Sequence, residues 1–326
     1  MPTYLQPGSY VGEIRTPAPI MALPSDVTAF VGHCETGPIG QPTTLYNLAD
    51  FERQFGATTW PGGHLPLAVA LFFANGGRQA VVLRAEPGSP LSAEVLAGAL
   101  LPRLEGRGVN LLCLPPERPA DALPAGAVTA AQDWCERPHA LLLVDPPPDW
   151  SDAKAARAGH EALAPRSGAA ALYFPRLRVA GSTLPVVPCG AVAGVLARTD
   201  AQRGVWRSAA GTEAALLGIT GLTLLLTKAQ QEQLNPANIN ALRFLQNQFL
   251  VWGGRTRSGD PAQRYIAVTR LRWLIEDSIR QGLAWTASER NGEAVSTASC
   301  AACTATARWR ARRRARPTSC AATRPP

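Results

Sequence analysis

The 326-residue sequence lacks several features that would place it in a common protein class. Its longest apolar candidate, residues 216–226, is interrupted by Gly and Thr and falls short of the roughly 18 residues that a bilayer-spanning helix needs. Its start, MPTYLQPGSYVGEI, has no basic segment followed by an apolar one, so we expect no signal peptide and synthesis in a cytoplasm. With 46% hydrophobic and 17% charged residues, the chain is expected to be a soluble globular protein.

Common catalytic motifs are also missing. The stretch GHCETGPIG after the first apolar strand lacks both the glycine triplet of a dinucleotide fold and the lysine of a P-loop. No Gly-x-Ser-x-Gly motif occurs. Histidine is scarce, and no two are spaced to form a metal-binding helix face: His33, His64, His139 and His160. We therefore expect no enzyme activity, no cofactor and no metal site.

Charge and cysteine are concentrated at the C-terminal end. Residues 287–326 hold eight Arg and two Glu, which supply +6 of the formal net charge of +8. The CAAC pair at Cys300 and Cys303 lacks the second pair that a structural zinc site needs. An arginine-rich arm that binds nucleic acid is an alternative interpretation of this tail. Four other cysteines lie singly in apolar segments and are expected to be core residues: Cys34, Cys113, Cys135 and Cys189.

Short apolar runs alternate with helical stretches from about residue 26 to 187, which predicts an α/β structure with a sheet covered by helices on both faces. Asn47 is expected to cap a helix that ends at Gly56, and the next helix should stop at residues 75–77. Two further helices are expected in SAEVLAGALLPRLEG and AGAVTAAQDWCERPH. The predicted strands are VTAFVGHC, QAVVLRAE, VNLLCLP, ALLLVDPP and AAALYFPRL.

Two segments outside this alternation carry further predictions. A short strand near the start of the chain cannot bury its apolar face alone, so it must add to a sheet of its own domain or of another copy; it consists of Tyr10, Val11, Gly12, Glu13 and Ile14. Residues 261–282 are predicted to form an amphipathic helix. Its apolar face should hold Leu271, Leu274, Ile275 and Ile279, and its charged face should hold Arg272, Glu276 and Arg280.

Several motifs resemble the contractile tail sheath family, which contractile phage tails, R-type bacteriocins and extracellular contractile injection systems share. The N-terminal ones are YLQPGSYVGEI, SDVTAFVGHCETGPIGQPTTLYNLADFERQFG and LAVALFFANGGRQAVVLR. The C-terminal ones are PCGAVAGVLARTDAQRGVWRSAAG, LNPANINALRF, WGGRT and RYIAVTRLRWLIEDSI. They occur in the family's order over about residues 4–285. Cys189 stands where the family often has Ser, and residues 207–211 lack a usual proline.

The resemblance implies a subunit with four parts. These are an N-terminal arm over residues 1–22, an outer α/β domain over 23–187, an inner tube-proximal domain over 188–294 and a tail over 295–326. In such a subunit the sheet of the inner domain is completed by strands from neighbouring copies, which fits the partnerless strand at residues 10–14.

The resemblance also implies a function. Copies would polymerise around an inner tube and contract to drive the tube through a target envelope, with other copies, the tube protein, the baseplate and a terminator as partners, and without nucleic acid or membrane insertion. Assembly is expected in a bacterial cytoplasm, as part of a virion tail or a released particle. Tube contacts are expected at Arg264, Arg270, Arg272 and Arg280. The alternatives are a nucleotide-binding, flavodoxin-like enzyme and a nucleic-acid binder that uses the basic tail.

After Ala294 the resemblance ends, and the remaining residues contain no Leu, Ile, Phe, Tyr or Met. Their Ala, Arg, Pro, Ser, Thr and Cys are typical of a GC-rich gene translated out of frame. We expect a frame-shifted, disordered tail from about Val295, with loss of the family's last helix and strand and poor polymerisation as consequences. Resequencing of the gene would test this hypothesis, since an intact frame encoding the same tail would contradict it.

Overall fold

The computed structural model describes residues 20–58, 63–118 and 121–284. The predicted strand at residues 10–14 and the tail from residue 295 therefore lie outside the described residues. The chain divides into two compact units. The larger is Pro24–Trp273, and the smaller contains the described residues 20–23 and 274–284.

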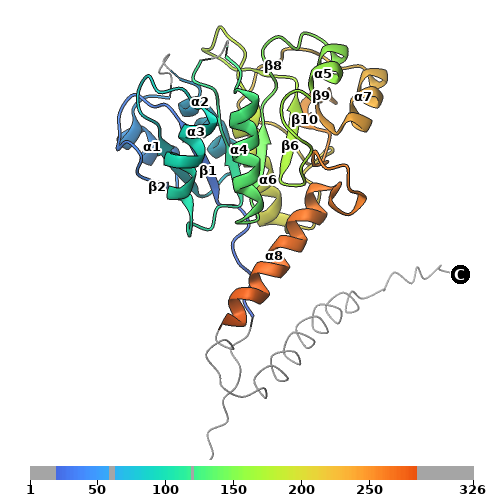
Figure 1. Ribbon diagram of the computed structural model, residues 1–326. Coiled ribbons are helices and arrows are strands. Elements are labelled where there is room, and N and C mark those ends of the chain that lie inside the picture. Colours follow the sequence, from blue (N-terminus) through green and yellow to red (C-terminus); the bar gives the residue numbers. More distant parts are fainter. Residues whose placement is uncertain (1–19, 59–62, 119–120, 285–326) are drawn as a thin grey trace, which may run out of the picture. The chain divides into compact units, whose positions relative to one another are not determined.

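The larger unit is built on an eight-stranded sheet in the order β10-β9-β6-β5-β4-β1-β3-β2 (Figure 1). Neighbours from β3 through to β9 run parallel, while β2 and β10 at the two ends run antiparallel to their neighbours. A second, two-stranded sheet pairs β7 with β8. The strand bounds are β1 Thr28–Gly32, β2 Thr43–Leu45, β3 Ala80–Arg84, β4 Leu111–Cys113, β5 Leu141–Val144, β6 Ala170–Phe174, β7 Leu177–Arg178, β8 Gly221–Leu222, β9 Ile239–Leu245 and β10 Gln248–Val251.

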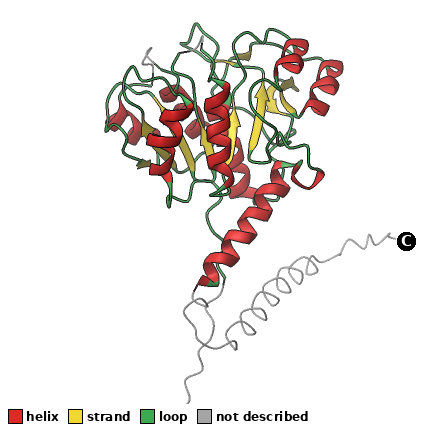
Figure 2. Cartoon of the chain, viewed as in Figure 1, coloured by secondary structure: helices red, strands yellow, loops and turns green. Residues whose placement is uncertain are grey.

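Helices cover both faces of this sheet, and the strands lie between them in Figure 2. None of the described helices is long and apolar enough to cross a bilayer. The helix bounds are α1 Leu48–Phe55, α2 Leu65–Ala74, α3 Ala93–Val95, α4 Ala125–Glu136, α5 Ala153–Gly159, α6 Cys189–Arg203, α7 Lys228–Leu234 and α8 Ile266–Gly282. Shorter turns are the π-helical η1 Leu96–Leu100 and the 3-10 helices η2 Leu101–Leu104, η3 Asn235–Ala237 and η4 Pro261–Gln263.

The local signals in the sequence predicted most of these elements. All five predicted strands are confirmed, as β1, β3, β4, β5 and β6, and nearly every residue in them is buried. The Asn47 side chain accepts a hydrogen bond from the amide of Asp50 at 2.8 Å, which caps α1. Gly56, with φ of 91°, ends the same helix. Parallel strands buried on both faces need continuous apolar runs, and this sequence supplies them.

The predicted boundary between residues 187 and 188 does not fit this sheet. β9 pairs in parallel with β6, and α6 packs against α2, so residues on both sides of that boundary belong to one sheet and one core. The larger unit therefore extends to Trp273. Apolar runs identify strands but do not say which strands pair, and β9 and β6 are separated by the whole segment that contains α6 and α7.

α6 approaches α2 so closely that two of its residues have room for hydrogen only. A Cβ atom on Gly190 would lie 2.0 Å from the main-chain oxygen of Ala68, and one on Gly194 would lie 2.4 Å from that of Phe72. The two glycines are four residues apart and so share one face of α6. Their backbone contact with α2 fixes how α6 covers the sheet.

Replacing Gly190 with alanine is expected to lower the free energy of unfolding by about 3 kcal/mol, because the new Cβ meets a main-chain oxygen and forces the two helices apart. Chemical denaturation followed by circular dichroism measures this change. Gly126→Ala in α4 is the matched control, since a Cβ there lies 3.6 Å from its nearest neighbour, the Cβ of Ala93. Equal stability of the two variants would contradict the helix contact.

Candidate functional site

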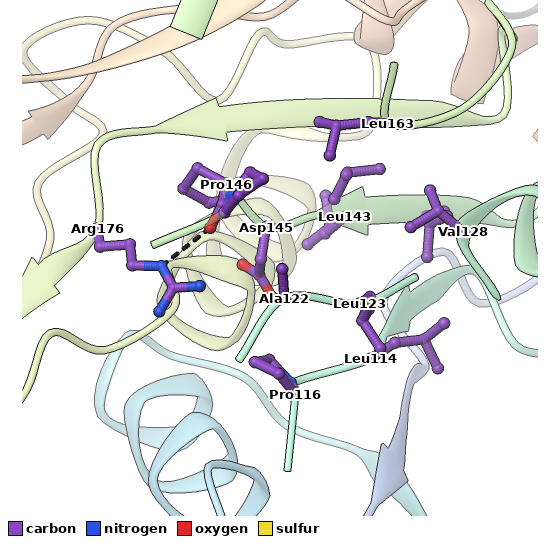
Figure 3. Close-up of a pocket in the computed structure, with 13 residues that line it drawn as sticks. Leu114, Pro116, Ala122, Leu123, Val128, Leu143, Asp145, Pro146, Leu163 and Arg176 are labelled. Carbon is purple, nitrogen blue, oxygen red and sulfur yellow. Dashed lines mark hydrogen bonds between the residues drawn. The ribbon is translucent and has the colours of Figure 1, made fainter. Parts of the chain in front are cut away.

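The carboxyl ends of parallel strands are where α/β proteins usually bind ligands. In this chain Asp145 follows β5 and Arg176 follows β6, and both line a small cavity at that edge. Figure 3 shows them beside the apolar side chains that fill most of the space. The cavity has a volume of about 10 Å³, which is room for about one water molecule. A nucleotide does not fit there.

The polar groups at this edge are engaged with the protein itself. Arg176 is buried, and its Nε donates a hydrogen bond to the carbonyl of Pro146 at 2.9 Å. Its Nη2 donates to the carbonyl of Asp121 at 3.1 Å. Burial lowers the pKa of the Arg176 guanidinium, and the carboxylate of Asp145 opposes that shift. The guanidinium thus holds two loops at the end of the sheet.

Asp145 begins α6. Its Oδ1 accepts a hydrogen bond from the amide of Cys189 at 2.9 Å, whereas its Oδ2 is buried and has no hydrogen-bond partner among the described residues. Burial raises the pKa of the Asp145 carboxyl to about 7, although hydrogen bonds from Cys189 and the charge of Arg176 act in the opposite direction. The carboxyl group is a helix cap that is costly to ionise.

Burial holds the thiols and the imidazole near this edge in their neutral forms. All four cysteines in the described part are buried, which confirms the prediction that they are core residues. Burial raises the pKa of Cys113, Cys135 and Cys189, so the nucleophilic thiolate is scarce. Burial, and secondarily Arg176, lowers the pKa of His64 to about 4. No group of three or more metal-ligating side chains with suitable placement occurs in the described ranges.

The four arginines predicted to contact a tube are placed differently from one another. Arg270 is buried and forms an ion pair with Asp200, with Nη2 to Oδ2 at 2.6 Å and Nη1 to Oδ1 at 3.2 Å. Arg272 and Arg280 are exposed, and Arg264 is half-buried. Arg280 donates to the carboxylate of Asp277 at 2.9 Å.

Arg270 is therefore not available for a surface contact, and the prediction that it contacts the tube is wrong. Its Nη2 also donates to the carbonyl of Ser25 at 2.5 Å, and the Ser25 hydroxyl donates to Asp200 at 3.1 Å. Sequence reasoning missed these two partners. The available signal was spacing, because Asp200 falls on the α6 face that also carries Ala193 and Ala197, both fully buried.

The titration of Asp145 gives a pH-dependent stability. Its folded pKa of about 7 lies above its ordinary value of 3.8, so folding favours the protonated form. The stability from this group is fully present below about pH 4 and is lost as pH rises to about 7, with a total of up to about 4 kcal/mol. Asp145→Asn keeps the acceptor for Cys189 and removes the charge, so we expect its unfolding free energy to exceed that of the native chain at pH 8.

Chemical denaturation between pH 5 and pH 8 measures this difference. Asp152→Asn is the control for an amide substitution at a helix N-cap, because Asp152 Oδ1 accepts from the amide of Ala155 at 2.7 Å in an exposed position. Identical pH slopes for the native chain and Asp145→Asn would refute a buried, titrating carboxyl.

Comparisons with known proteins agree with one another. The family described as "Phage tail sheath protein central domain" matches residues 94–257, about half of the chain. None of the curated proteins matches this chain in sequence. Among solved structures, a chain of the anti-feeding prophage (AFP) helical sheath in its contracted state is 26% identical with a TM-score of 0.76. The similarity covers 98% of this chain and 87% of the AFP chain.

Two further solved structures are similar over most of their length. A chain of the AFP baseplate is 26% identical with a TM-score of 0.71, covering 94% of this chain and 84% of that one. A chain of the contracted sheath complex of PVC, an extracellular contractile injection system, is 23% identical with a TM-score of 0.73 and coverage of 93% and 80%. The flavodoxin-like enzyme and the nucleic-acid binder receive no support from these comparisons.

The family match, the similarity of 98% of the chain to a helical sheath subunit and the filled carboxyl edge of the sheet lead to one conclusion: the chain belongs to the phage tail sheath family and is a structural sheath subunit.

Proposed function

We propose that copies of this chain polymerise around an inner tube and that contraction of the polymer drives the tube through a target envelope. The observation that carries this proposal is the similarity over 98% of the chain to a subunit of a contracted helical sheath. A baseplate and a terminator protein would lie at the two ends of the polymer. The similarity to a chain of a baseplate complex supports the baseplate as a partner. Assembly would take place in a bacterial cytoplasm.

Contraction of this kind needs no nucleotide. Subunits would assemble in a lattice of higher energy and repack into one of lower energy when triggered, so the stored energy is a difference between two sets of subunit contacts. The filled cavity at the carboxyl edge supports this proposal, because it leaves space for about one water molecule.

The N-terminal strand at residues 10–14 is proposed to link subunits by joining a sheet of a neighbouring copy. One candidate acceptor, the outer edge of β10, is already occupied within the larger unit. The amide of Leu216 donates to Phe249 at 2.8 Å, and the amide of Val251 donates to Ala214 at 3.0 Å. We therefore propose an acceptor other than β10.

Strand linkage predicts that one main-chain amide in the arm matters for assembly. Val11→Pro removes an amide donor and disfavours a paired strand, so we expect it to abolish rings or striated tubes in electron micrographs of the chain co-expressed with its tube partner. Val11→Thr keeps both the amide and the β-branched shape and is expected to assemble like the native chain. Native chains that remain compact monomers, with the strand at residues 10–14 paired within its own chain and no helical polymers, would overturn the proposed function.

Tube contact is proposed for the three remaining arginines, Arg264, Arg272 and Arg280, because cations on the inner face of a sheath would pair with an acidic tube. Reversing Arg272 and Arg280 to Glu is expected to lower tube association roughly thirtyfold, at about 1 kcal/mol for each exposed contact. Lysine at the same two positions should retain most of the association. Co-sedimentation with the tube protein measures this, and full association of the Glu variant would exclude these contacts.

A further inference from the structure

The two ends of the eight-stranded sheet carry opposite charge. At the β2 end, Glu35, Glu52 and Glu86 are exposed, and we call these three residues the acidic corner. They come from the loop after β1, from α1 and from the loop after β3. None of them forms an ion pair with another residue in the described part of the chain.

Main-chain contacts hold the acidic corner in place. The amide of Thr36 donates to the carbonyl of Phe55 at 3.2 Å, which fixes the loop after β1 against the end of α1. A Cβ on Gly56 would lie 2.7 Å from the Glu35 carboxylate, so that carboxylate lies beside the end of α1, where the amide of Gly56 donates to the main-chain carbonyl of Glu52 at 3.2 Å. The Arg84 guanidinium donates hydrogen bonds of 2.6 to 3.0 Å to the main-chain carbonyls of Cys34, Gly37 and Glu35. These bonds anchor the loop after β1.

At the other end, α7, β9 and the residues after β10 enclose a groove of about 320 Å³ that we call the basic groove. Lys228 and Arg243 line it, and Glu232 is the acidic residue in its lining. The Arg243 guanidinium lies 5.1 Å from the centre of the Trp252 ring, which forms part of the groove. Arg255 adds a third cation, since its Nη1 donates to the carbonyl of the groove residue Asn235 at 2.9 Å.

We propose that the acidic corner of one copy docks into the basic groove of the next. Charge complementarity identifies the occupant: the three glutamates of the acidic corner have no ion-pair partner among the described residues, and three cations outnumber Glu232 at the basic groove. The two surfaces lie at opposite ends of one sheet (Figure 1), so the contact is head-to-tail, leaves one free surface on each side, and repeats as a ring or an open helix. The inference rests on the proposed function, which requires such repetition.

Apolar contact accompanies the charges on both surfaces. Trp252 is 37% exposed in the groove, and Ile39, which pairs with Arg84 beside the acidic corner, is 43% exposed. Partly exposed apolar side chains within a charged surface are what a docking contact covers when the charges have brought two surfaces together.

A charge-swap experiment on the full chain tests this pairing. Lys228→Glu with Arg243→Glu is expected to reduce self-association about tenfold or more in sedimentation velocity, because the two new carboxylates would face the glutamates of the acidic corner. Glu52→Lys with Glu86→Lys is expected to do the same. Combining all four substitutions should restore association to within about threefold of the native value. Arg107→Glu with Arg137→Glu makes the same change in net charge on other exposed positions and should leave association unchanged.

Each other outcome overturns the proposal. If both reversed variants associate like the native chain, the pairing is wrong while the sheath function stands. If the reversed variants fail to associate and the four-substitution variant does not recover, the two surfaces are not partners. If the native chain shows no self-association at low or high salt, the pairing fails, and electron microscopy of the chain co-expressed with its tube partner decides the proposed function separately. Circular dichroism of every variant separates lost association from lost folding.

Discussion

The buried ion pair between Arg270 and Asp200 is the interaction on which the larger unit depends. Both side chains are almost fully enclosed, at 4% and 3% exposed, and the guanidinium meets the carboxylate through two nitrogens. Removing one partner of such a pair leaves an uncompensated buried charge, at a cost of about 3–5 kcal/mol. The Ser25 carbonyl and hydroxyl complete the network. It therefore joins the start of the unit to α6 and to the first turns of α8.

This network lies where the chain enters and leaves the larger unit. Ser25 is one residue from the boundary at Pro24, and Arg270 is three residues from the boundary at Trp273. The pair therefore specifies which segments meet at both crossing points, since replacing either member would leave the other charge buried without a partner.

Local features of the sequence predicted the elements of the sheet well, and pairing over long distances was not predictable from them. Continuous apolar runs gave five strands, and the residues Asn47 and Gly56 gave the ends of α1. The domain boundary was misplaced because β9 carries no signal that it pairs with β6. The predicted apolar face of α8 was also partly wrong, since Ile275 is 49% exposed while Arg270 is 5% exposed. Sequence periodicity places Arg270 among the polar, exposed residues. Its burial is favourable because Asp200 on α6 provides the opposite charge. Of the candidate site, the arm at residues 10–14 and the arginines 264, 272 and 280 remain predictions.

The fold shows how an architecture common among enzymes serves a structural subunit. In ligand-binding members of such folds, the carboxyl edge of the sheet is hollow and its polar groups converge on a substrate. Here Arg176 donates a hydrogen bond to the carbonyl of Pro146, and Asp145 accepts one from the amide of Cys189. The cavity beside them has a volume of about 10 Å³. The polar groups that would be catalytic elsewhere hold loops and start a helix.

The same contrast separates the inside of the subunit from its proposed contacts. A sheath that contracts must exchange one set of subunit contacts for another without unfolding any subunit. Exposed ion pairs suit contacts that are exchanged, since each is worth about 0–1 kcal/mol and water replaces either partner readily. Enclosed contacts such as Gly190 on α2 and Arg270 on Asp200 suit the interior, since a side chain at Gly190 would clash with α2 and removing either charge would leave the other unpaired. The opposite charges at the two ends of the sheet belong to the first kind, so a head-to-tail contact built from them can re-form at a new angle while the sheet itself stays intact.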